Sequence, residues 1–163
     1  MKNIFLLPVI LFFYIYISGC SGYKPIFSAS DLKFVVEDHE IEGDKKLGNI
    51  IYSKLYNLSK GNEKKPKAQS VNILIKISKD KISTAKDSTG KILEYKTTIN
   101  ANFLISDYLS NEKILDKNYI LSSSYKAHDQ YSETIKNENI VIENLLNKIY
   151  QDILVSMSQY NIK

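Results

Sequence analysis

The chain has 163 residues, a formal net charge of +4 and a single cysteine. Its 22 basic residues face 18 acidic ones and are all lysines, so no arginine fork is available for bidentate binding of phosphate or carboxylate. The lysines are interleaved with Asp and Glu, whereas nucleic-acid-binding proteins concentrate basic residues in one patch. This composition excludes nucleic acid as the expected partner. One cysteine also excludes an intramolecular disulfide, so the fold must depend on its apolar core.

The first 20 residues carry the features of a bacterial lipoprotein signal. Lys2 precedes an apolar run over residues 4–17, two small residues follow, and Cys20 comes directly after them. This order is typical of a secretory signal peptide, and the run is shorter than the roughly 20 residues of a membrane-spanning helix. We predict that residues 1–19 are cleaved off and that Cys20 is acylated. The alternative is a structural cysteine that happens to follow a signal peptide.

Acylation of Cys20 predicts where the protein resides. Each buried methylene group contributes about 0.8 kcal/mol and one chain anchors only reversibly, so several chains on one cysteine would give a lasting membrane attachment. Ser21 follows the cysteine in place of Asp, which favours export to the outer membrane, with the protein on its periplasmic side. We predict an acylated tether over residues 20–30 and a single domain over residues 31–163.

The domain is predicted to begin with a strand and a helix. Apolar residues alternate with polar ones over residues 32–37, which is the period of a half-buried strand. Asp44 can cap a helix that we predict over residues 45–59, and Gly61 can end it. The apolar face of this helix comprises Leu47, Ile50, Ile51, Leu55 and Leu58.

Three further strands are predicted from the most regular part of the sequence. Apolar residues alternate with polar ones over residues 71–78, 93–105 and 115–127. Turn-forming residues separate these runs at positions 87–90 and 110–112. Strands joined by short polar turns favour an antiparallel meander with one dry and one polar face.

A long amphipathic helix is predicted to close the domain. It begins between Ser132 and Lys136 and runs to about Gln159. Its apolar face comprises Ile135, Ile142, Leu145, Leu146, Ile149, Ile153 and Met157. The predicted fold class is therefore α+β: a two-layer sandwich in which a mostly antiparallel four-stranded sheet carries two helices on one face, in the order strand-helix-strand-strand-strand-helix.

No motif of a catalytic, metal or cofactor site stands out. His39 and His128 are isolated in the sequence, without the spacing of metal ligands. The chain has no Gly-X-Ser-X-Gly elbow and no glycine-rich phosphate loop. We therefore expect a protein that is not an enzyme and that uses no cofactor.

Two passages resemble a known family. The segment Cys-Ser-Gly-Tyr-Lys-Pro-Ile-Phe at residues 20–27 is similar to the Cys-Gly-aromatic-X-Pro-Leu-Tyr start of the LptE family of lipopolysaccharide-assembly lipoproteins. The passage Ser-Ser-Tyr at residues 123–125, followed by Tyr131-Ser132 and a long helix, also resembles that family, as does the order of the elements. The resemblance implies a non-enzymatic lipoprotein that sits within the outer-membrane β-barrel LptD, plugs it, and assists the assembly of lipopolysaccharide into the outer membrane.

The resemblance transfers no binding residue, so candidates come from their placement on the strands. Lys76 and Lys96 fall on the polar face of the meander, in mid-strand and beside asparagines, and are our candidates for binding the phosphates of lipopolysaccharide. The alternative is that these lysines keep an exposed sheet face soluble. A different function also stays open: a lipid-anchored module that binds a small hydrophobic ligand between the sheet and the helices.

Overall fold

The computed structural model describes residues 32–62 and 68–160. Cys20, the predicted signal peptide and the tether lie outside the described residues. Six elements follow in the predicted order: β1 (Phe34–Gly43), α2 (Lys45–Lys60), β2 (Gln69–Lys86), β3 (Ile92–Asp107), β4 (Lys113–Lys126) and α3 (Tyr131–Gln159). The predicted α+β fold class is confirmed.

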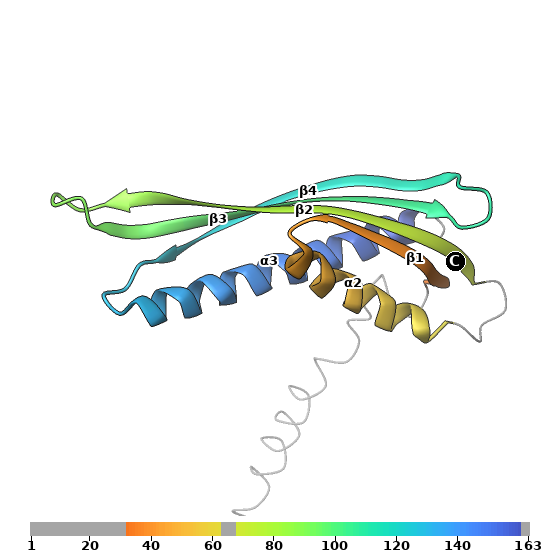
Figure 1. Ribbon diagram of the computed structural model, residues 1–163, viewed down its shortest axis with the longest axis horizontal. Coiled ribbons are helices and arrows are strands. Elements are labelled where there is room, and N and C mark those ends of the chain that lie inside the picture. Colours follow the sequence, from red (N-terminus) through yellow and green to blue (C-terminus); the bar gives the residue numbers. More distant parts are fainter. Residues whose placement is uncertain (1–31, 63–67, 161–163) are drawn as a thin grey trace, which may run out of the picture.

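The sheet has the strand order β1-β2-β3-β4. β1 and β2 are parallel because α2 carries the chain back between them, whereas β2, β3 and β4 pair antiparallel through short turns. Both helices lie on the same side of the sheet, α2 against β1 and β2 and α3 against β3 and β4 (Figure 1). The sheet is thus mostly antiparallel and carries its helices on one face, as the sequence predicts.

Two strands extend beyond their predicted ends. β1 was expected over residues 32–37 but continues to Gly43, with an irregularity in its pairing between Val36 and Asp38. β2 continues to Lys86, well past its last buried apolar residue, because its backbone remains paired with β3. The turn that joins β2 to β3 consequently lies at the tip of a long hairpin (Figure 1).

The predicted cap of α2 is confirmed by geometry. The Asp44 carboxylate accepts hydrogen bonds from the backbone N–H groups of Lys46 and Leu47, both at 3.1 Å. At the other end, Gly61 donates its backbone N–H to the Ser59 carbonyl oxygen. α3 starts at Tyr131, one residue before the predicted range, and has no side-chain cap.

The cap gives a first testable prediction. Replacing the Asp44 side chain removes an acceptor from two N–H groups of the first helical turn, so Asp44→Ala is expected to lower the free energy of unfolding by about 1 kcal/mol. Equilibrium urea unfolding followed by circular dichroism measures this loss. Asp44→Asn keeps a capping oxygen and should remain close to the native protein; an equal loss in both variants would contradict the assignment.

The core fills the space between the sheet and the two helices. Phe34, Phe103, Ile51 and Ile149 are fully buried in it. Further buried core residues are Val71, Ile73, Ile75 and Ile77 on β2, Ile99, Ala101 and Ile105 on β3, and Leu145, Leu146, Ile153 and Met157 on α3. Among the described residues, neither helix combines the length and hydropathy that crossing a bilayer requires.

Candidate functional site

The central part of the sheet face turned away from the helices carries mainly polar side chains, with exposed Ile120 among them and the outward Leu74–Leu104 row beside it. Alternate residues of a strand point to opposite faces, so the neighbours of the buried core positions point outward here. The register aligns them in rows across β2, β3 and β4: Lys76 with Asn102 and Asn118, Ser78 with Asn100 and Ile120, Asp80 with Thr98 and Ser122. We call these nine residues the open face. Its centre is built mainly from short, uncharged polar groups.

Lys76, the first predicted binding residue, already has a partner. Its Nζ lies 3.0 Å from the Glu42 carboxylate of β1, and both side chains are about half exposed. The pair borders a shallow depression of about 450 Å³ on the open face, which Asn100 and Asn102 also line. The depression thus presents amides and one neutralised lysine.

Lys96, the second predicted binding residue, lies elsewhere on the same side of the sheet. It is half-buried on β3, between Ile82 and Ser124 in the neighbouring strands. Asn102, which pairs with Lys76, lies six positions further along β3. At about 3.3 Å per residue the two lysines stand roughly 20 Å apart, so they do not form one phosphate site.

The opposite side of the sheet holds a cluster that the sequence analysis missed. Glu138 of α3 is 8% exposed and accepts from Lys81 Nζ at 2.5 Å and from Lys79 Nζ at 3.5 Å. Lys81 also lies over the Tyr95 ring, 4.3 Å from its centroid, and 5.6 Å from that of Tyr125. We call these five residues the Glu138 cluster. The cluster joins the first half of α3 to the end of the sheet that carries the β2–β3 turn.

The charges of the cluster stabilise one another. Burial alone would raise the pKa of the Glu138 carboxyl, but its hydrogen bond and attraction to Lys81, with the charge of Lys79, hold that pKa below its ordinary value. Burial likewise opposes the charge on Lys81, yet the contacts with Glu138 and Tyr125 raise the pKa of the ammonium to about 12. Glu138 and Lys81 are therefore both charged at neutral pH. The cluster is a structural ion pair rather than a poised acid or base.

The sequence contained a signal for this cluster. Lys79 and Lys81 continue the odd-numbered series of core residues on β2, so their parity places them on the helix side of the sheet. Glu138 lies four residues before Ile142 on α3, in the helical register of the apolar stripe. Ile135, which we predicted on that stripe, is only half-buried, and Thr134 is buried in its place.

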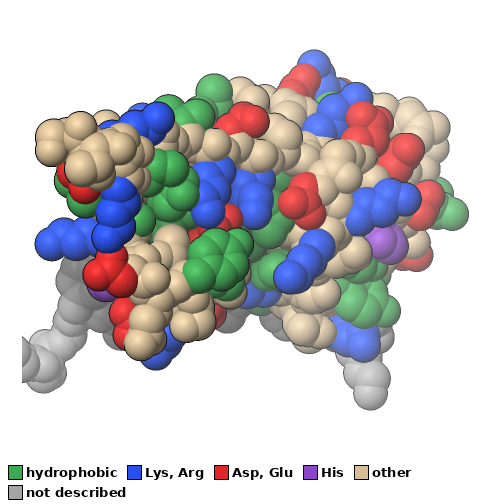
Figure 2. Space-filling model, turned by 60° about the vertical axis from the view of Figure 1, so that its left-hand side comes forward, with side chains coloured by type: hydrophobic (Ala, Val, Ile, Leu, Met, Phe, Trp, Pro, Cys, Tyr) green, Lys and Arg blue, Asp and Glu red, His purple; other side chains and the backbone are tan. Residues whose placement is uncertain are grey.

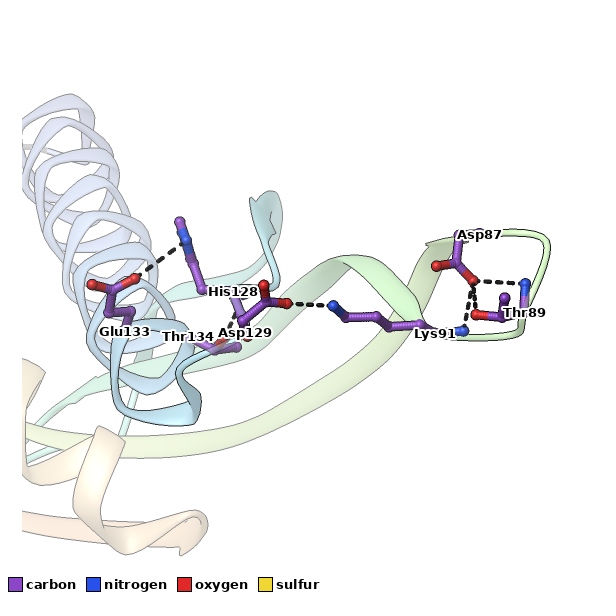
Figure 3. A network of polar contacts seen from close by, with 7 residues as sticks. All are labelled: Asp87, Thr89, Lys91, His128, Asp129, Glu133 and Thr134. Atoms are coloured by element: carbon purple, nitrogen blue, oxygen red, sulfur yellow. Dashed lines mark hydrogen bonds and ion pairs between the residues drawn. The ribbon is translucent and has the colours of Figure 1, made fainter.

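The two histidines have structural contacts. The His39 ring stacks on Tyr52 of α2 with centroids 3.7 Å apart. His128 donates its backbone N–H to Thr134 Oγ1 at 2.8 Å, and its Nδ1 lies 3.4 Å from the Glu133 carboxylate (Figure 3). The contacts of His128 fix the start of α3. In residues 32–62 and 68–160, no three His, Cys, Asp or Glu side chains are grouped as a metal site would require.

Further polar contacts connect the tip of the β2–β3 hairpin to the loop between β4 and α3, which contains His128. Lys91 pairs with Asp129, which follows His128, and Asp87 accepts hydrogen bonds from Thr89 and from the Lys91 backbone (Figure 3). The Thr89 hydroxyl, aided by these backbone groups, lowers the pKa of the Asp87 carboxyl. Lysines and carboxylates are interspersed on this side of the molecule, as Figure 2 shows, rather than gathered into a patch of one sign.

A second concavity lies between the two helices. A groove of about 400 Å³ lies between the first half of α2 and the middle of α3, and Lys79 of β2 also lines it. The alternative prediction is a ligand site between the sheet and the helices; core side chains fill most of that space, and this groove has residues of both helices and of β2 in its lining.

No family model and no curated protein sequence matches this chain. Solved structures do match it. The rare lipoprotein B from Shewanella oneidensis has a TM-score of 0.52 at 14% identity, covering 77% of this chain and 96% of its own. For lipoprotein B from Nitrosomonas europaea the TM-score is 0.58 at 15% identity, with 82% and 88% covered. For the minor lipoprotein from Acinetobacter baumannii it is 0.51 at 16%, with 77% and 94% covered. At these identities the likeness shows a fold in common with bacterial lipoproteins.

Proposed function

We propose that this protein is an outer-membrane lipoprotein, anchored through acylated Cys20, that forms a complex with a β-barrel of the LptD type and plugs it. In this role it assists the assembly of lipopolysaccharide into the outer membrane from the periplasmic side. The lipoprotein part of the proposal is supported by the signal sequence before Cys20 and by the shared fold. The proposal that the partner is a β-barrel requires a surface on this protein that suits a polar lumen.

The open face is the observation that supports a β-barrel as the partner. The lumen-facing side chains of membrane β-barrels are polar, so a protein seated there must present polar groups that pair without burying isolated charges. The rows centred on Thr98, Asn100 and Asn102 supply amides and hydroxyls that both donate and accept hydrogen bonds, and Asp80 adds one carboxylate that a donor on the partner has to match. The one lysine of the face is neutralised by Glu42. Lys96 lies beside this surface and is the remaining candidate for contact with a lipid phosphate.

Affinity capture tests the proposal. Tagged, acylated protein is extracted from outer membranes in mild detergent, washed at high salt, and analysed by mass spectrometry together with what accompanies it. We expect one large β-barrel in a stoichiometric amount. Recovery of the protein alone, with its acyl anchor intact, would contradict the proposal.

A matched pair of variants localises the interface. Asn100→Arg places a long charged side chain at the centre of the open face, and Asn144→Arg places the same side chain on the exposed surface of α3. Because a buried unpaired charge is strongly unfavourable, Asn100→Arg should lose most of the captured barrel while Asn144→Arg retains it. Equal retention by both variants would exclude the open face as the interface.

A further inference from the structure

The groove between α2 and α3 has an apolar interior. Leu146 of α3 and Leu47 of α2 are 1% and 5% exposed, and together with Ile142 they form its floor. Ile50 forms part of the wall and is 37% exposed. The volume of about 400 Å³ falls at the lower end of the range typical of small-molecule sites. This interior suits one extended hydrocarbon chain.

The rim of the groove favours an anion. Three lysines and two carboxylates line it, which leaves one net positive charge. The Asp44 carboxylate is engaged in capping α2, and Lys79 shares the single carboxylate of Glu138 with Lys81. Lys54 contacts the neutral side chain of Asn147 and lies 5.8 Å from the centroid of the Tyr150 ring. Counted against the carboxylates of Asp44 and Glu143, the three lysines leave one positive charge on the lining of the groove.

We propose that this groove binds a single-chain fatty acid, with its alkyl chain over Leu47, Ile142 and Leu146 and its carboxylate among the rim lysines. One monoanionic head balances the single net charge of the rim, and one chain is what a narrow groove between two helices accommodates. Lysine acts as a point charge and needs no bidentate geometry, so a carboxylate is an adequate partner. The groove is lined mainly by residues of α2 and α3. Both helices lie on the side of the sheet opposite the open face, so both surfaces can be occupied together (Figure 1). The inference does not depend on the proposed barrel complex.

Photolabelling of the full acylated protein in phospholipid nanodiscs tests the inference. The label is dodecanoate with a diazirine near the chain end, and labelled peptides are mapped by mass spectrometry. We expect labelling to concentrate on the groove-lining parts of α2 and α3 and to be suppressed by unlabelled dodecanoate but not by dodecyltrimethylammonium. Labelling spread over the whole surface, or equal competition by the cationic amphiphile, would overturn the proposal.

Two matched pairs of variants sharpen the test. Lys46→Glu reverses a rim charge and Ile50→Lys places a charge on the wall, whereas Lys45→Glu and Ile140→Lys make the same changes at exposed positions that do not line the groove. We expect labelling to fall at least about fivefold in each groove variant and to stay near native in each control. Similar losses in a variant and its control would overturn the inference. Asn100→Arg should label normally, which separates this result from failure of the barrel complex.

Discussion

Gly43→Ala is expected to be the most damaging single-methyl change at the junction of β1 and α2. Gly43 has a backbone φ of +85°, a conformation that residues with a Cβ rarely adopt, and a Cβ there would clash with the backbone carbonyl oxygen of Ile77. That carbonyl already accepts the Asp44 N–H at 2.8 Å, so it cannot move without loss of a hydrogen bond. We expect the free energy of unfolding to fall by about 3 kcal/mol, measured from the urea midpoint and slope.

Gly90 provides a matched control for the conformational part of this effect. It has a φ of +88° in the turn between β2 and β3, but a Cβ added there meets nothing within 4 Å. Gly90→Ala therefore incurs the backbone strain without the clash, at a cost of about 1 kcal/mol. If the two variants lost equal stability, the close approach of Gly43 to Ile77 would have no energetic consequence.

The fold was largely predictable because the hydrophobic period changes at each element. Alternation identified β2, β3 and β4, and the spacing of Leu145, Ile149 and Ile153 identified α3. The end of β1 was not predictable in this way, since its pairing with β2 is irregular after Val36 and the outward positions that follow are acidic. Backbone pairing extends that strand, and such pairing leaves little trace in side-chain periodicity. Charged residues on an edge strand are also a common protection against aggregation, which hides the strand further.

The candidate sites were less predictable, for a physical reason. Lys76 and Lys96 were correctly placed on the polar side of the sheet, but their separation and the pairing of Lys76 with Glu42 depend on register and on the parallel β1 strand. Lys79 and Lys81 were not among the predicted binding residues. The ion pairs of both lysines depend on Glu138, which is more than 50 positions away in sequence, so strand parity placed the lysines but could not identify their partner.

Removing the Glu138 side chain is expected to loosen the first half of α3. Glu138→Ala leaves Lys79 and Lys81 without their carboxylate, and their side chains are only 32% and 29% exposed. We expect a loss of about 2 kcal/mol in the free energy of unfolding, because removal of one partner leaves poorly solvated charges unpaired. Glu143 lies on the same helix but is exposed, so Glu143→Ala should change the free energy by less than about 0.5 kcal/mol.

The pH dependence of stability separates the charge of Glu138 from its packing. The pKa of its carboxyl is lower in the folded than in the unfolded chain, so its contribution is complete above the ordinary pKa of 4.5 and is lost as pH falls through the folded value. For Lys81 the contribution is complete below the ordinary pKa of 10.5 and is lost as pH rises towards about 12. Glu138→Gln keeps the shape and removes the charge. The free energy of unfolding of Glu138→Gln should therefore be lower than that of the native protein by a constant amount near neutral pH, and the difference should disappear in acid. Urea unfolding at a series of pH values measures this difference. A deficit that persists at the acid end would mean that packing of the side chain, and not its charge, holds α3 to the sheet.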